Sequence, residues 1–117
     1  KGQSFRKRVG FALHGIKITT TRESSFRTQL LAAAALIALL LAIRPSPVWC
    51  AILALTVGLV LVTELINSAL ETLIDHLHPD QHPEIGAAKD IAAGAVLVSS
   101  LIALVVAVVF FADRLLT

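Results

Sequence analysis

The feature that most constrains the fold of this chain is a run of uncharged residues from Ile91 to Ala112. Its length matches the roughly 20 apolar residues with which an α-helix crosses the ~30 Å hydrocarbon core of a bilayer. Two further apolar stretches, residues 30–43 and 48–63, precede it. Apolar residues make up 56% of the 117 residues, against ~45–50% in a typical soluble domain. We therefore predict one domain, residues 1–117, forming an all-α membrane protein of three transmembrane helices.

The expected spans cover residues of about 28–44, 48–76 and 87–112. The first apolar run is short for a bilayer, so residues at its ends must extend it. The sequence Arg44-Pro45-Ser46-Pro47 then turns the chain. The second span keeps its helical period as far as Asp75, giving a helix of about 28 residues and about 42 Å. This helix should cross the membrane and emerge from it, and residues 78–83 form a loop.

Residues of about 4–22 are predicted to form an amphipathic helix. Phe5, Val9 and Ile16 recur at helical spacing, whereas Arg6 and Lys17 lie on other faces. Such a helix prefers the headgroup plane of the membrane. The alternative is a helix that packs on the rest of the protein.

The distribution of basic residues predicts the orientation. Seven of the ten lysines and arginines precede Thr28, and only Arg44 lies in the first turn between spans. By the positive-inside rule, the N-terminus and the loop between spans two and three are cytoplasmic. The basic end suits a surface of anionic lipids. It does not indicate nucleic-acid binding, because no base-reading module accompanies the charge.

The second span carries a polar stripe where it leaves the membrane. Glu64, Asn67, Glu71 and Asp75 are three, four and four residues apart, and therefore share an arc of about 80°, with Ser68 beside it. A charge near the bilayer centre costs at least ~2.5 kcal/mol, so such residues are functional candidates. A solvated helix face would explain Asp75, near the helix end, but explains Glu64 poorly.

Other charged residues are expected at the same depth. Glu23 precedes the first span, and Lys89 and Asp90 begin the third. Carboxylate oxygens suit Mg²⁺, and Mg²⁺ with a lysine can neutralise transferring phosphates. A further carboxylate can accept a proton from a hydroxyl nucleophile. These parts suit phosphoryl transfer, although neither G-x-x-x-x-G-K-[ST] nor G-x-G-x-x-G occurs.

Two other function classes remain open at this point. A small proton-coupled transporter would also use a membrane-embedded glutamate, but it needs that acid near the midplane and has no use for the additional polar residues at the membrane edge. A structural or assembly subunit would have little use for so many acids. A transition-metal site made by His76, His78 and His82 is a further alternative, although prolines interrupt that loop. Trp49 is interpreted as an anchor at the far interface.

Three segments resemble the bacterial integral-membrane diacylglycerol kinase family, which includes the undecaprenol kinases. They are Glu23-Ser-Ser-Phe-Arg27, then Glu64-Leu-Ile-Asn67-Ser-Ala-Leu-Glu71-Thr-Leu-Ile-Asp75, and Ala88-Lys89-Asp90 with the residues after it. The resemblance covers residues of about 5–113. The block E-x-x-N-[ST]-A-x-E-x-x-x-D followed by A-K-D is highly specific.

The resemblance implies a homotrimer with an N-terminal surface helix, in the bacterial inner membrane, whose sites draw on neighbouring subunits. It implies transfer of the γ-phosphate of MgATP to a lipid hydroxyl at the cytoplasmic face. Glu64 matches the family's general base and, with Ser68, contacts the lipid substrate. Glu23 and Glu71 match its metal-binding carboxylates. The residues that match positions around the nucleotide are Lys7, Phe11, Glu23, Asn67, Glu71, Asp75, His82, Gly86, Lys89 and Asp90.

The chain departs from the family at two N-terminal positions. Phe11 stands where a tyrosine is usual, and Ser4 stands where an arginine would help to hold phosphate. These changes affect the expected nucleotide contacts and leave the carboxylates intact. The residues after Asp90 also look like the undecaprenol kinase branch. We therefore expect a diacylglycerol kinase that makes phosphatidic acid, with an undecaprenol kinase as the alternative.

Overall fold

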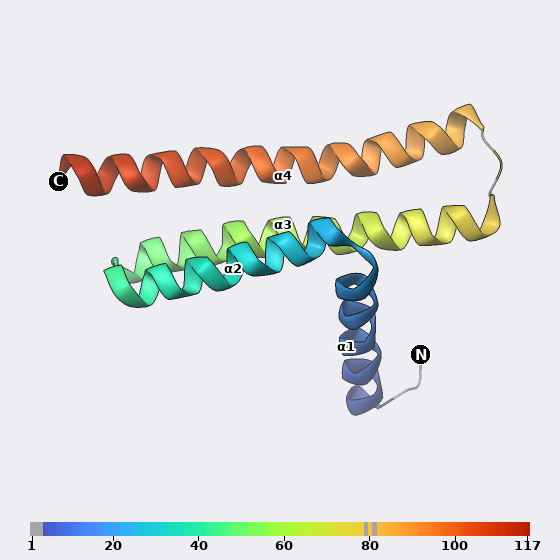
Figure 1. Cartoon of the computed structure of the whole chain (residues 1–117), viewed down its shortest axis with the longest axis horizontal. Coiled ribbons are helices and arrows are strands. Elements are labelled where there is room, and N and C mark those ends of the chain that lie inside the picture. Colours follow the sequence, from blue (N-terminus) through green and yellow to red (C-terminus); the bar gives the residue numbers. More distant parts are fainter. Residues whose placement is uncertain (1–3, 79, 81) are drawn as a thin grey trace.

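The computed structural model describes residues 4–78, 80 and 82–117, and these residues form four helices and no strand. The helices are α1 (Phe5–Arg22), α2 (Ser24–Ile43), α3 (Pro47–Leu77) and α4 (Pro83–Leu116) (Figure 1). The last three are long and apolar enough to cross a membrane. The prediction of an all-α protein is confirmed, and so is the prediction of three helices with the length and composition to span a membrane.

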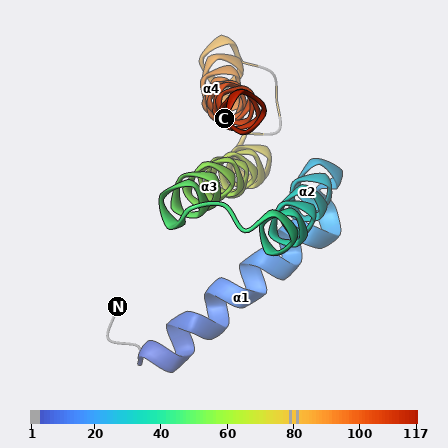
Figure 2. The same ribbon diagram turned by 90° about the vertical axis from the view of Figure 1, so that its left-hand side faces the viewer.

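The three long helices lie side by side, and α1 projects away from them at a steep angle from the start of α2 (Figures 1 and 2). Helix α3 occupies the middle and contacts each of the other three helices, with α4 as its main partner. Over the described residues, α2 and α4 do not contact each other. Helices α3 and α4 continue past the corner between α1 and α2 towards the loop that joins them (Figure 1). The polar end of α3 therefore projects beyond α2.

The corner between α1 and α2 is fixed by hydrogen bonds. Glu23 has an extended backbone and serves as the C-cap of one helix and the N-cap of the next. The Arg27 guanidinium donates to the carbonyl oxygens of Thr20 and Thr21, at 2.9 and 3.0 Å. These carbonyls belong to the last turn of α1, which a cation stabilises. The direction of α1 relative to the membrane spans is therefore set by a side chain of α2.

The turn between α2 and α3 is short and has defined caps. Arg44 adopts a left-handed conformation with φ of 52°, and its N–H donates to the Leu40 carbonyl. Ser46 accepts from the Trp49 N–H, and Pro47 occupies the first position of α3. Proline suits that position because the missing N–H would have no helical partner there. The turn thus brings α3 back along α2.

Helices α3 and α4 pack through a seam of residues spaced by three and four. On α4 the seam includes the buried residues Ala92, Ser99 and Phe110. Small side chains allow two membrane helices to approach closely, and the Ser99 and Thr63 hydroxyls are hydrogen-bonded at 2.9 Å. Near the other end, Trp49 packs edge-on against Phe110 at 5.2 Å. The Trp49 indole also donates to Asp113 at 3.1 Å, so this residue joins α3 to α4.

Most of the apolar surface of the spans is not covered by the chain itself. Only 6%, 17% and 11% of the most apolar windows of α2, α3 and α4 are buried. A chain with so little internal burial needs lipid, further protein or both around it. On α1, Phe5 and Leu13 are exposed. The helical state of α1 is observed, and its position in the headgroup plane stays a prediction.

Candidate active site

The polar stripe of α3 is a continuation of the face that packs in the bundle. The buried residues Leu53, Val60 and Glu64 follow the same spacing that leads on to Asn67 and Glu71. One side of the helix is therefore apolar in its first half and acidic in its second half. The change from apolar to acidic residues occurs at Glu64, which is only 8% exposed. This burial argues against a solvated helix face at that position.

Glu64 is held by a residue of α2. Ser25 donates its hydroxyl to Glu64 Oε2 at 3.3 Å. Ser25 was not among the residues expected in the site, and its proximity to Glu23 in sequence was the signal that could have indicated it. The contact links the first turn of α2 to the point where α3 becomes acidic. Glu23, which precedes this turn, is half-buried.

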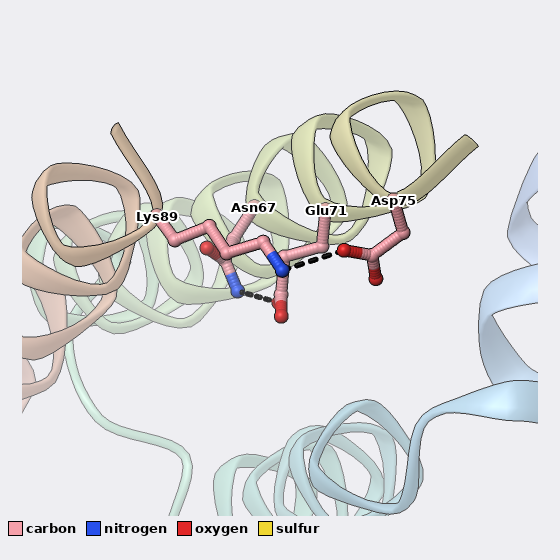
Figure 3. Close-up of polar contacts among 4 residues, drawn as sticks. All are labelled: Asn67, Glu71, Asp75 and Lys89. Carbon is pink, nitrogen blue, oxygen red and sulfur yellow. Dashed lines mark hydrogen bonds and ion pairs between the residues drawn. The ribbon is translucent and has the colours of Figure 1, made fainter. Parts of the chain in front are cut away.

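The middle of the stripe contains a second hydrogen-bonded pair. Asn67 Nδ2 donates to Glu71 Oε1 at 2.8 Å (Figure 3). Asn67 Oδ1 is buried, and it is the one such side-chain atom among the described residues that lacks a partner. A buried amide oxygen without a donor or a cation loses hydration without compensation. The pair therefore presents an oxygen that a ligand could satisfy.

Lys89 crosses from α4 to the end of the stripe. Its ammonium group contacts Asp75 Oδ1 at 2.5 Å, and Figure 3 shows the side chain reaching across from α4 towards α3. The two side chains are 37% and 61% exposed. Lys89 lies three residues before Ala92 and so belongs to the seam. Asp90, the next residue, is exposed and makes no ion pair with a described residue, and its role at the site stays a prediction.

The donor set can be tested against Mg²⁺. Among the described residues, no group of three or more His, Cys, Asp or Glu side chains is arranged to hold a metal ion. Magnesium in nucleotide sites is usually held by one or two carboxylates together with phosphate oxygens. The Glu71 carboxylate and the unpartnered Asn67 oxygen fit that requirement, and the role of Glu23 as a further metal carboxylate stays a prediction. The oxygen chemistry of the site is therefore suited to Mg²⁺ bound with a nucleotide.

A groove of about 540 Å³ lies between α1 and α3, beside the polar stripe. Its lining is largely apolar and includes Ile16, Leu65 and Ala69, while Ser68 supplies a hydroxyl and Arg22 a cation. Ser68, predicted to contact the lipid, thus lies in a groove that suits an apolar chain with a polar end.

The remaining predicted nucleotide contacts lie outside this cluster. Lys7 is exposed in the first turn of α1, and the Phe11 side chain is 59% exposed. His82 is the N-cap of α4, where its Nδ1 accepts from the Glu84 N–H at 3.1 Å. Gly86 is exposed in the following turn. Their role in nucleotide binding stays a prediction.

Comparison with known proteins decides the family. A sequence profile described as prokaryotic diacylglycerol kinase matches residues 10–111. The chain belongs to this family. The resemblance found in the motifs is thereby confirmed, and it favours a lipid kinase over a transporter.

Individual relatives carry two different names. The chain is 29% identical to the diacylglycerol kinase of Escherichia coli (strain K12) over 101 residues, which is 85% of this chain and 81% of that protein. It is 32% identical to the undecaprenol kinase of Bacillus subtilis (strain 168) over 111 residues, 95% of this chain and 90% of the relative. It is 33% identical to a diacylglycerol kinase of Synechocystis sp. (strain ATCC 27184 / PCC 6803 / Kazusa) over 97 residues, 82% of this chain and 55% of that one. These names indicate a lipid kinase, and the three helices of membrane-spanning length indicate a bacterial membrane protein.

Proposed function

We propose that this protein is a MgATP-dependent lipid kinase that transfers the γ-phosphate of ATP to diacylglycerol and so forms phosphatidic acid. The observation that supports the proposal best is the change of α3 from an apolar to an acidic face at Glu64. A kinase for a membrane lipid must bring a lipid hydroxyl to a water-soluble phosphate donor. The boundary between the two halves of α3 is a suitable meeting point.

In the proposed reaction, the hydroxyl oxygen of the lipid attacks the γ-phosphorus of ATP. A bond forms between that oxygen and phosphorus, the bond to the β–γ bridging oxygen breaks, and ADP leaves. Glu64 accepts the proton of the attacking hydroxyl. Its burial and its contact with Ser25 hold the carboxylate in one place for this transfer.

Charge on the phosphates is offset by groups further along the stripe. The Lys89 ammonium contacts Asp75 and so places a cation near the end of α3. Glu71, Asn67 and Glu23 are the proposed holders of Mg²⁺. When bound, Mg²⁺ would supply positive charge to the phosphate oxygens. Asn67, by donating to Glu71, keeps that carboxylate turned along the stripe.

The groove between α1 and α3 is the proposed place for the lipid. Its apolar lining suits an acyl chain, and Ser68 faces the groove four residues after Glu64. Residues four apart on a helix lie on the same side. A lipid could therefore enter sideways from the bilayer with its hydroxyl at headgroup depth.

We further propose that the active protein is a homotrimer with a cytoplasmic N-terminus. Two observations support additional copies of the chain. The spans bury little of their surface within one chain, and no cluster of three acidic or histidine ligands is formed by its described residues. Neighbouring copies would bury the exposed apolar surface of the spans and would supply further metal ligands. The excess of basic residues before Thr28 supports the orientation.

Undecaprenol is the second candidate acceptor. The relative named undecaprenol kinase matches 95% of this chain, more than the diacylglycerol kinase of E. coli does. The same groove and the same base would serve an isoprenoid alcohol. The two candidates therefore differ in the lipid and share the chemistry.

The deciding experiment is a phosphorylation assay with radiolabelled ATP in mixed micelles that contain diacylglycerol or undecaprenol, one at a time. We expect faster labelling of diacylglycerol, and faster labelling of undecaprenol would select the second candidate. Glu64→Gln should abolish turnover while ATP binding, measured separately, persists. If folded wild-type protein phosphorylates neither lipid, the kinase proposal is wrong, and proton-coupled efflux from proteoliposomes would then favour a transporter.

A further inference from the structure

Ser25 is the residue of α2 whose side chain is hydrogen-bonded to Glu64. Its hydroxyl lies in the first turn of α2 and donates to Glu64 Oε2. Glu64 makes no other side-chain hydrogen bond to a described residue. A buried carboxylate requires hydrogen-bond donors, because burial removes the water that would otherwise solvate its charge. Within the described chain, Ser25 is therefore the side chain that meets this need.

The other polar groups of the stripe are already engaged. Asn67 donates to Glu71, and Lys89 pairs with Asp75. Neither donor is directed at Glu64. The stripe thus contains one pair within α3, one carboxylate paired with Lys89 of α4, and one carboxylate, Glu64, that depends on α2. This separation means that Ser25 can affect the base without disturbing the pairs that serve the phosphates.

The contact also divides the two oxygens of Glu64 between two tasks. Oε2 accepts from Ser25, and Oε1 has no partner in the described chain. Asn67 Oδ1 is the one fully buried and unpartnered side-chain oxygen found there, so Glu64 Oε1 retains some exposure. A base must accept its proton through an oxygen that the incoming hydroxyl can reach. Oε1 meets that condition while Oε2 fixes the carboxylate plane.

We propose that Ser25 is a positioning residue for the reaction, which holds the Glu64 carboxylate so that Oε1 faces the acceptor hydroxyl. The inference rests on the proposed function, in which Glu64 is the base. The 3.3 Å separation is long for an O–H···O bond, and catalytic hydrogen bonds often shorten only when substrates are bound. The Arg27 contacts that fix the α1–α2 corner also fix the turn that carries Ser25.

The test compares two substitutions of equal shape. Ser25→Thr keeps a hydroxyl, and Ser25→Val replaces it with a methyl group. We expect Ser25→Val to lower kcat about tenfold, since a hydrogen bond to a charged group is lost, with the KM for ATP changed less than twofold. Ser25→Thr should stay within about threefold of wild type. Ser24→Ala removes a neighbouring exposed hydroxyl and should leave kcat unchanged.

A second readout does not depend on turnover. The infrared carboxylate bands of Glu64, assigned by subtracting the spectrum of Glu64→Gln, should shift in Ser25→Val and remain in Ser25→Thr. Equal kcat values for the valine and threonine variants, or unshifted bands in both, would overturn the inference. An inactive wild-type protein would instead contradict the proposed function, and the infrared comparison would still decide whether Ser25 holds Glu64.

Discussion

The hydrogen bond between Thr63 and Ser99 allows a quantitative test of how α3 and α4 are joined. Ser99 is 2% exposed, and each hydroxyl also lies within hydrogen-bond distance of a carbonyl of its own helix, Thr63 of Val60 and Ser99 of Val96. Each hydroxyl has one proton, so one of the two donates to the other hydroxyl while the second donates to its own carbonyl. Removal of one hydroxyl therefore leaves the other with an acceptor, so no buried donor is orphaned. Interhelical hydrogen bonds in membranes average about 0.6 kcal/mol and reach about 1.7 kcal/mol. We expect Ser99→Ala to cost about 0.6 kcal/mol.

A larger side chain at the same position should have a much larger effect. Ser99 faces α3 where small residues permit close approach, and Leu requires space for additional carbon atoms. Overpacking of a filled contact typically costs about 1–3 kcal/mol. Ser99→Leu should also move α4 away from α3 and weaken the contact of Lys89 with Asp75, because both lie on the same seam. Turnover should therefore fall in Ser99→Leu and persist in Ser99→Ala.

The assay is reversible unfolding in mixed micelles, followed by the fluorescence of Trp49. This residue is the single tryptophan of the chain, and it lies between α3 and α4 against Phe110. Thr63→Ala and the double alanine variant complete a mutant cycle, with an expected coupling near the cost of the single substitution. A cost above about 2 kcal/mol for Ser99→Ala, or a stable and active Ser99→Leu, would refute this account of the seam.

Two further predictions concern the acidic end of α3. Glu71→Gln should raise the Mg²⁺ concentration that gives half-maximal activity, because it removes one of the proposed metal carboxylates while the contact with Asn67 can persist; an unchanged magnesium titration would contradict that role. Asp75→Asn should lower turnover through release of Lys89 and leave the unfolding midpoint nearly unchanged, since exposed ion pairs contribute little to stability. Asp113→Asn is the matched control, because that carboxylate lies at the other end of α4 and bonds Trp49.

Sequence periodicity was sufficient to predict the stripe, because residues on one helix keep fixed angular relations. Contacts between helices were harder to predict. The pairing of Lys89 with Asp75 depends on the register of α3 against α4, and that register is set by buried small residues such as Ala92 and Ser99. An apolar run with small residues at many positions permits several registers, so the sequence alone did not select one.

Asp90 shows how helix geometry separates two residues that are adjacent in sequence. It was expected to join Lys89 at the acidic cluster, since both begin the third span. Adjacent residues on a helix point about 100° apart, and Lys89 already occupies the seam position. Asp90 is consequently exposed on another side of α4. Ser25 was missed for a different reason, because its contact with Glu64 joins residues on different helices, and the segment from Glu23 to Arg27 did not indicate which of its side chains reaches α3.

The depth of each polar residue along α3 gives the proposed chemistry its spatial order. At 1.5 Å per residue, Glu64 lies about 26 Å from the start of the helix, whereas Asp75 lies about 42 Å from it. The hydrocarbon core of a bilayer is about 30 Å thick, so a base at Glu64 lies within reach of a lipid hydroxyl at the inner edge of the core. In the proposed orientation, Asp75 and its partner Lys89 lie beyond that edge, where phosphates are hydrated. The groove beside Ser68 is largely apolar, so under the proposed function a membrane lipid suits this site better than a water-soluble alcohol does.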